Sequence, residues 1–207
     1  MKYKYFKYLY FILKFKMKHY IETGNSNLSG LELNIDDLLE KCVEEVDGLL
    51  IHNPEIYVYG KKCNQHRSIG FFSNTSIGYR YSGQLAESIQ LTPNTELLLN
   101  HVNSILNSDF NGILVNKYAN GEDYIGKHSD DETCLSNSGV VAISYGAVRK
   151  FRIREKKSGK IVLDVPTNHG EMLIMNGDFQ KEFTHEIPIE KKIKNPRFSF
   201  TFRKHTR

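Results

Sequence analysis

The tripeptide His128-Ser129-Asp130 offers the most informative pair of side chains in this chain. Side chains alternate between the two faces of an extended segment, so a His and an Asp two positions apart lie on the same side. From there an imidazole nitrogen and a carboxylate oxygen can reach one metal ion. His185, far downstream, is the candidate for a third ligand. Two His and one carboxylate form a facial triad, which suits Fe(II) and leaves coordination positions open for chemistry.

Taken alone, this pair is weak support for a metal site. The chain has 8 His, and His169-Gly170-Glu171 is a second pair of a His and a carboxylate. A His in a satisfied core or on the surface is commoner than a ligand. The interpretation therefore depends on what the rest of the chain places beside His128 and Asp130.

The segment that ends the chain is predicted to be a strand with two contrasting faces. Three Phe share one face, which can pack in a core between sheets, and two Arg and two hydroxyls share the other. In a central strand the two Arg would require an anion, because an unpaired buried charge costs several kcal/mol. A dicarboxylate would satisfy both guanidinium groups. The alternative is an edge strand with a solvated polar face. The faces are Phe198, Phe200 and Phe202 against Arg197, Ser199, Thr201 and Arg203.

An earlier segment repeats this arrangement. Asn116 and Tyr118 are two residues apart on the strand that precedes the His-x-Asp pair. An amide and a phenol there add neutral hydrogen-bonding groups to the same cavity.

The pattern along the chain predicts two amphipathic helices and a run of short strands. Apolar residues recur at helical spacing over about 35–49, with Asn34 as the N-cap, and again after Thr92-Pro93. From residue 111 onward, turn signals such as Asn-Gly separate alternating segments. The strands predicted there are Ile113–Tyr118, Tyr124–His128, Val140–Tyr145, Lys150–Arg154, Ile161–Val165, Glu171–Met175, Thr184–Ile187 and Phe198–Phe202.

Before that run we expect a strand over 56–59, a polar loop over 61–67 and a strand–turn–strand over 68–82. Together these elements predict an α+β, mostly β fold, an antiparallel sandwich or jelly roll. The two helices would buttress one of its sheets from outside. The mouth of such a sandwich suits a metal site.

Length and charge predict a single globular domain with a basic tail. A chain of 207 residues can bury one core. Residues 1–18 hold six Lys and no acid, while the remainder carries a formal charge of −2, so global charge gives no argument for nucleic acid. We expect residues 1–30 to be a basic, aromatic tail with a linker over 22–30, and residues 31–207 to form the domain.

The cysteines and the apolar runs indicate the compartment in which the protein is expected to lie. Cys42, Cys63 and Cys134 are odd in number and scattered, which indicates reduced thiols of an intracellular protein. No apolar stretch approaches the roughly 20 residues that cross a bilayer. The run over 8–13 is short for a signal peptide, so no membrane association is expected.

The order of these motifs resembles the AlkB-type dioxygenases, which depend on Fe(II) and 2-oxoglutarate and fold as a double-stranded β-helix, or jelly roll. The resemblance runs from about residue 32 to residue 205. It is carried by Asn116-Lys117-Tyr118, by Gly121–Glu132 with His128-Ser129-Asp130-Asp131-Glu132, by Ser144-Tyr145-Gly146-Ala147, by Gly170–Met175, by His185 and by Pro196–Arg203.

This resemblance implies a metal site and a cosubstrate pocket. Fe(II) would be held by His128, Asp130 and His185, with 2-oxoglutarate and O2 as cosubstrates. Arg197 would pair with the distal carboxylate of 2-oxoglutarate. Ser199 stands where relatives often carry Asn, and His169 would lie in a turn before a structural strand. The other residues lining the cosubstrate pocket would be Asn116, Tyr118, Thr201 and Arg203.

The N-terminal half is most similar to the eukaryotic members that act on duplex DNA. The segment 58–61 resembles a hairpin whose apolar residue fills the gap left by a flipped base, with Tyr59 as the wedge. Arg67 follows at the matching distance, although His66 replaces the usual Pro. The segment 79–83 resembles the lid over the base. The substrate-binding residues so implied are Tyr59, Arg67, Tyr79, Tyr81, Ser82, Asp131 and Glu132.

A basic run follows these motifs. Residues 149–160 carry seven basic side chains and one acid. This run would either track the phosphate backbone of a nucleic acid or form a solvated hairpin.

The implied activity is oxidative demethylation of N-alkylated bases such as 1-methyladenine and 3-methylcytosine in DNA. This direct-reversal repair releases formaldehyde. A methylated base inside a stacked duplex cannot reach iron, so it must be flipped. We expect a monomer that acts on duplex DNA, in the nucleus or wherever the DNA resides. The alternatives are the same chemistry on RNA, on single strands or on a protein. A non-enzymatic member that binds nucleic acid is a further alternative, against which the complete triad and both Arg weigh heavily.

Overall fold

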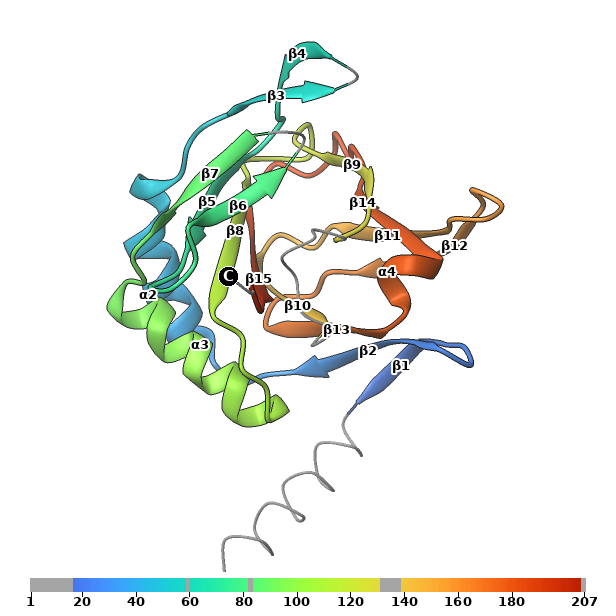
Figure 1. Ribbon diagram of the computed structural model, residues 1–207, viewed down its shortest axis with the longest axis horizontal. Coiled ribbons are helices and arrows are strands. Elements are labelled where there is room, and N and C mark those ends of the chain that lie inside the picture. Colours follow the sequence, from blue (N-terminus) through green and yellow to red (C-terminus); the bar gives the residue numbers. More distant parts are fainter. Residues whose placement is uncertain (1–16, 59, 82–83, 131–138, 206–207) are drawn as a thin grey trace, which may run out of the picture.

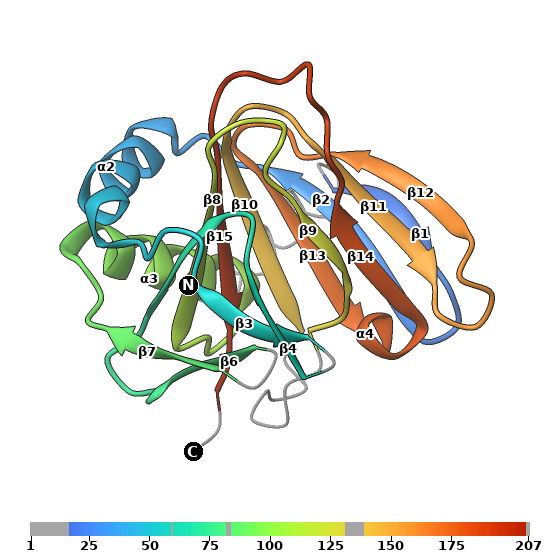
Figure 2. The same ribbon diagram turned by 90° about the horizontal axis from the view of Figure 1, so that it is seen from above.

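The computed structural model is built from two facing β-sheets with two helices on one outer face (Figures 1 and 2). It describes residues 17–58, 60–81, 84–130 and 139–205. Within these ranges the larger sheet has nine strands, in the spatial order β1 (Lys18–Glu22), β2 (Ser26–Glu32), β13 (Glu171–Gly177), β10 (Val140–Gly146), β15 (Arg197–Arg203), β8 (Gly112–Tyr118), β5 (Ser68–Phe72), β7 (Gln84–Ile89) and β6 (Gly78–Tyr81).

The smaller sheet faces the middle of the larger one. Its order is β12 (Ile161–Pro166), β11 (Lys150–Glu155), β14 (Phe183–Ile187) and β9 (Ile125–His128). A separate hairpin, β3 (Glu55–Val58) and β4 (Lys61–Asn64), stands beyond β7 at one end of the molecule (Figure 1). The helices are α2 (Asp36–Val46), α3 (Pro93–Leu106) and the single turn α4 (Phe179–Glu182), with a 3₁₀ turn at Asp47–Leu49. The expected α+β, mostly β jelly roll with two buttressing helices is confirmed.

Both long helices begin close to where the sequence predicts. Helix α3 starts with a capping box in which the side chains of Thr92 and Thr95 bond each other's backbone N–H groups, and Pro93 occupies the first turn. Helix α2 begins with Ile35 at the N-cap and has no side-chain cap, so the predicted Asn34 cap is wrong. No helix in the described ranges is long and apolar enough to cross a membrane.

Strand β15 lies between β10 and β8 and is buried along its whole length. Its three Phe pack with residues of α2 and α3, such as Leu39 and Leu98, in the core between the helices and the larger sheet. The polar face points the other way, into a cavity that also contains residues of the smaller sheet. The prediction that the Phe face packs between the sheets is therefore wrong, and so is the edge-strand alternative.

Residues 22–30 do not form a linker. Strand β2 pairs with β13 over seven residues, from Ser26 to Glu32, and Leu28 is 0% exposed between the two sheets. Of the two Gly residues that suggested a flexible segment, Gly30 lies where the chain packs closely, whereas a Cβ at Gly24 would meet nothing within 4 Å. A Cβ at Gly30 would meet the carboxylate of Glu171.

Besides β1 and β2, which lie where a tail and a linker were expected, two further strands and the short helix α4 were not predicted. Residues 61–64 form β4 rather than a loop, and their side chains are all exposed, so they show no alternation of apolar and polar residues. Strand β7 runs parallel to β5 and pairs with it at Phe71 and Phe72. It follows the strand–turn–strand unit expected over 68–82, after which no further strand was predicted. Neither strand carries a regular apolar face.

The burial of β2 gives the first prediction. Replacing Leu28 with Ala should lower the free energy of unfolding by about 2–5 kcal/mol, because it leaves a cavity between the sheets. Chemical denaturation measures this difference. As a control, Leu49→Ala, at a position that is 46% exposed, should change stability by less than about 0.5 kcal/mol. If Leu28→Ala behaves like the control, residues 22–30 are a linker after all.

Candidate active site

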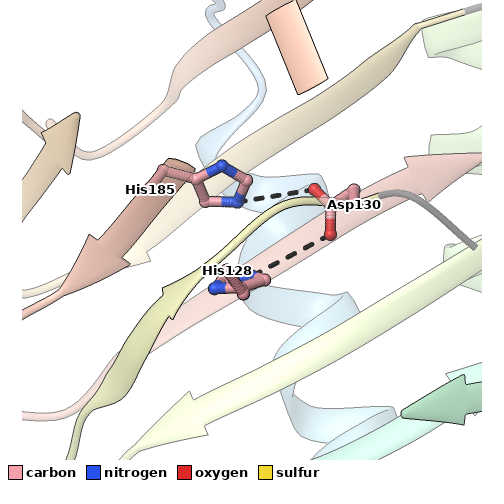
Figure 3. A group of neighbouring side chains, drawn as sticks. All are labelled: His128, Asp130 and His185. Carbon is pink, nitrogen blue, oxygen red and sulfur yellow. Dashed lines mark ion pairs between the residues drawn. The ribbon is translucent and has the colours of Figure 1, made fainter. Parts of the chain in front are cut away.

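The structure brings His128, Asp130 and His185 together (Figure 3). Strands β9 and β14 pair in antiparallel fashion with His128 directly opposite His185, and their rings meet edge to face with centroids 4.4 Å apart. Asp130 follows two residues after the end of β9. Its carboxylate oxygens lie 3.9 Å from Nε2 of His128 and 3.5 Å from Nε2 of His185. The three donor atoms all lie within 4.8 Å of one another.

Hydrogen bonds fix the orientation of this group. Nδ1 of His128 lies 2.9 Å from the carbonyl oxygen of Gly126, which can only accept, so Nδ1 carries the proton and Nε2 keeps its lone pair. The backbone N–H of Asp130 donates to the side chain of Gln180 in α4 at 2.9 Å. The ring of His185 stacks on Phe151 at 4.9 Å.

The electrostatics keep all three groups in their metal-binding forms. Burial lowers the pKa of His128, and burial together with the neighbouring His128 lowers the pKa of His185 to about 3. Burial alone would raise the pKa of Asp130, but the guanidinium of Arg203 and the two imidazoles lower it to about 2. At neutral pH the site therefore presents two neutral imidazoles and one carboxylate. This donor set fits Fe(II), and one ion can reach all three after small side-chain movements.

One cavity joins the triad to the polar face of β15. It lies between the two sheets, and every residue expected in the cosubstrate pocket lines it. Ser144 of β10 and Tyr79 of β6 line it as well. The five expected residues are Asn116, Tyr118, Arg197, Thr201 and Arg203.

Arg197 lies at the start of β15 and is 3% exposed. Its Nη2 donates to Ser144 at 2.9 Å, and its guanidinium lies over the ring of Tyr118 at 5.3 Å. Nε and Nη1 have no hydrogen-bond partner among the described residues. Burial lowers the pKa of Arg197 to about 10, so the group remains charged at neutral pH. A buried cation with two free N–H groups fits a carboxylate of a ligand bound in the cavity.

Comparison with known proteins agrees with this geometry. The 2OG-Fe(II) oxygenase superfamily matches residues 32–203. The chain is 34% identical to the DNA oxidative demethylase ALKBH2 of Homo sapiens, over 80% of this chain and 66% of that protein. It is 33% identical to ALKBH2 of Mus musculus, over 80% of this chain and 72% of that protein. The chain belongs to the AlkB-type dioxygenases.

Two further similarities are more limited. The alpha-ketoglutarate-dependent dioxygenase alkB homolog 3 of Bos taurus is 34% identical over 52% of this chain and 41% of that protein. The solved structure of OsALKBH1 has a TM-score of 0.57 and 17% identity, and covers 89% of this chain and 100% of that one. This second similarity shows a shared fold. The chain matches slightly less than two thirds of the human ALKBH2, so the activity of that whole protein is not carried over by similarity alone.

Membership of the superfamily makes Fe(II) the metal, and 2-oxoglutarate and O2 the cosubstrates.

Arg203 contacts the metal triad directly, since its Nη2 donates to Oδ1 of Asp130 at 2.5 Å. The same guanidinium lies 4.7 Å over the ring of Tyr79. Arg203 therefore holds the carboxylate of Asp130 in place, a contact that the spacing in the sequence did not reveal.

Arg67 does not lie on an exposed surface. It is 2% exposed, and its Nε donates to Oδ1 of Asn116 at 2.7 Å. A guanidinium in this position orients the Asn116 amide toward the cavity. The expectation that Arg67 binds the nucleic-acid substrate stays a prediction.

The remaining substrate residues are described only in part. Tyr79 is 3% exposed and lines the cavity. For Tyr81 the structure describes only the backbone, in β6. The positions that lie outside the described residues are Tyr59, Ser82, Asp131 and Glu132.

The rival pair of His169 and Glu171, and the basic run over 149–160, both contact other side chains and backbone groups of the protein. His169 lies in the turn before β13 with Nε2 3.2 Å from Asp36, while the Glu171 carboxylate accepts from Tyr20 at 2.7 Å. In the basic run, Arg149 is 1% exposed and donates to three backbone carbonyls. Further along it, Arg152 pairs with Asp164 and Arg154 with Glu186. These contacts favour the hairpin over a phosphate track.

Sequence reasoning missed Ser144 and Gln180 as partners of site residues. Ser144 belongs to a motif of the family resemblance and faces the same cavity as Arg197, so its position in the strand was a usable signal. Gln180 lies in a single helical turn that has no periodicity, and nothing in the sequence marks it.

The triad generates the second prediction. His128→Ala, Asp130→Ala and His185→Ala should each abolish turnover and weaken metal binding at least about 100-fold, because two ligands do not hold Fe(II) in an open site. Calorimetric titration with Mn(II) measures the affinity without turnover. His169→Ala, in the rival pair, is the matched control and should bind Mn(II) like the unaltered protein. Retained 2-oxoglutarate-dependent turnover in any triad variant would refute the assignment.

Arg67 generates the third prediction. Arg67→Met should raise the apparent KM for 2-oxoglutarate about 5- to 30-fold with a smaller change in kcat, since Asn116 loses a charge-assisted bond worth about 1–2 kcal/mol. Steady-state kinetics with varied 2-oxoglutarate measure both constants. The control Arg152→Met removes a partly exposed Arg from its ion pair and should leave the KM unchanged. A lower kcat with an unaltered KM would show that Arg67 has only a structural role.

Proposed function

We propose that this chain demethylates N-alkylated bases in DNA with Fe(II), 2-oxoglutarate and O2. The observation that carries the proposal is a single cavity lined both by the metal triad and by the buried, charged Arg197. Such a cavity suits a small dicarboxylate that reaches the metal with one end and a guanidinium with the other. Relatives named as DNA oxidative demethylases support DNA as the substrate.

Residues of β15 and β8 that line the cavity bind the cosubstrate and hold a metal ligand. Arg197 pairs with the distal carboxylate through Nε and Nη1, which have no other partner among the described residues. Asn116, Tyr118 and Thr201 line the path between that carboxylate and the metal. Arg203 donates a hydrogen bond to Oδ1 of Asp130 and so holds this carboxylate in position to bind the iron.

When bound, iron, 2-oxoglutarate and O2 supply the oxidation of the N-methyl carbon. That carbon leaves as formaldehyde, the ring nitrogen regains its pairing position, and the cosubstrate leaves as succinate and CO2. The protein binds, orients and encloses the reactants. Burial keeps His128 and His185 neutral, so that neither ring has to lose a proton before it binds the metal.

The substrate is a flipped base, and we propose duplex DNA as its source. An N1- or N3-methylated base has lost its pairing, which lowers the cost of extrusion and gives part of the selectivity. The proposed contacts to the base come from Tyr59, Tyr79, Tyr81, Ser82, Asp131 and Glu132. The enzyme would act as a monomer, in the nucleus or wherever the DNA resides.

A turnover assay tests this proposal. Purified protein with Fe(II), 2-oxoglutarate and a 1-methyladenine duplex should release formaldehyde and succinate in equal amounts. Omission of 2-oxoglutarate, or the His185→Ala variant, should release neither. Methylated RNA and single-stranded DNA in parallel reactions identify the preferred substrate. Succinate formation with a methylated protein but with none of these nucleic acids would contradict the proposal.

The fourth prediction concerns the proposed wedge. Tyr59→Ala should slow repair of the methylated duplex about 5- to 150-fold relative to a single strand, because base–aromatic stacking contributes roughly 1–3 kcal/mol and only the duplex leaves a gap to fill. Rates on both substrates and the melting temperature of the variant are the measurements. An unchanged ratio of duplex to single-strand rates refutes the wedge.

A further inference from the structure

A second cavity adjoins the iron pocket. It has a volume of about 420 Å³ and lies between the 51–55 segment and the β6–β7 hairpin, with Gln65 and Ile69 also in its lining. This size falls within the roughly 300–1,000 Å³ typical of small-molecule sites. We call it the amide groove, after Asn53, Gln65 and Gln84 in its lining.

Backbone contacts hold the walls of the amide groove in place. The N–H of Gln65 donates to the carbonyl of Pro54 at 2.9 Å, and Ile51 and Ile69 form a β-bridge. Asn53 has φ +44°, a left-handed conformation that Asn tolerates better than most residues. The groove is thus formed by paired segments of the fold.

Two amide oxygens of the groove accept no hydrogen bond from any described residue. Gln65 is 5% exposed, and its Oε1 lacks a hydrogen-bond partner within the described part of the chain. The same is true of Oδ1 of Asn53. A buried polar atom without a partner costs about 1–3 kcal/mol, so a ligand that brings N–H groups would be bound favourably. Because a side-chain amide carries both an acceptor and a donor, it can pair with the edge of a nucleobase in two places.

The charges around the groove favour a base over a phosphate. No Arg or Lys is among the described residues that line it. Among the described lining residues, which include His52, the only carboxylate is that of Glu55, and it pairs with Lys62 at 2.6 Å on the exposed hairpin. Apolar walls such as Ile69 and Leu85 suit a flat, neutral ring.

The groove and the iron pocket share Tyr79, which lines both. A strand that places one base at the iron would therefore bring a neighbouring base to the groove. We propose that the amide groove binds an unmodified, amino-bearing base next to the flipped base, through the amide of Gln65. This inference rests on the proposed function and adds a dependence on sequence context.

Binding of short DNA strands to the metal-free protein tests the proposal without turnover. The probes are fluorescent single strands that each contain one 1-methyladenine. In the first set, the base on its 5′ side is adenine, purine or thymine. In the second set, the base on its 3′ side is varied in the same way. In one of the two sets, the strand with adenine should bind at least about 5-fold more tightly than the strand with purine, because purine lacks only the amino group. Equal affinities in both sets overturn the proposal, and this comparison requires no variant.

Gln65→Leu is the informative variant, and Gln90→Leu, at an exposed position outside the groove, is its control. Gln65→Leu should abolish the preference for adenine, while its melting temperature stays the same or rises because an unpartnered polar group is removed. Gln90→Leu should keep the preference. Retention of the preference in Gln65→Leu overturns the role of that amide. Demethylation without base preference would reject the groove alone, and base preference without demethylation would reject the proposed function alone.

Discussion

Two guanidinium groups buried between the sheets are the constraint on which this structure depends. Arg203 is neutralised within the protein, since its Nη2 donates to the Asp130 carboxylate at 2.5 Å and both side chains are 2% exposed. Arg197 has only hydroxyl and ring neighbours in the contacts described above, so its charge is left for a ligand. Because an unpaired buried charge costs several kcal/mol, the fold pairs one cation internally and the anionic cosubstrate can pair the other.

The sequence predicted both faces of β15 and the cavity that its polar face lines, but it misplaced the Phe face. Alternation assigns Phe198, Phe200 and Phe202 to one face, and it does not tell which layer covers that face. Here the two amphipathic helices cover the outer face of the larger sheet, and the Phe face packs beneath them. The polar face then points between the sheets, where His128 and His185 meet it. The spacing of His128 and Asp130 was predictable from the alternation of side chains along an extended segment, whereas His185 was assigned as the third ligand through the resemblance to the AlkB-type family.

Other predictions failed in segments whose side chains carry no periodic signal. Residues 22–30 have the composition of a linker, yet Gly30 is small because Glu171 lies against it. The side chains of β4 are all exposed, so nothing distinguishes them from a loop. Arg67 and Gln180 act through Asn116 and Asp130, which lie 49 and 50 residues away along the chain. Only tertiary packing brings such partners together, so a local pattern cannot reveal them.

A crystal structure of the protein with Mn(II) and 2-oxoglutarate, grown without oxygen, tests the central claim most directly. The metal should bind Nε2 of His128, Nε2 of His185 and the Asp130 carboxylate. The distal carboxylate of 2-oxoglutarate should lie against Nε and Nη1 of Arg197. A metal bound by other residues, or a distal carboxylate that leaves Arg197 without a partner, would contradict the account.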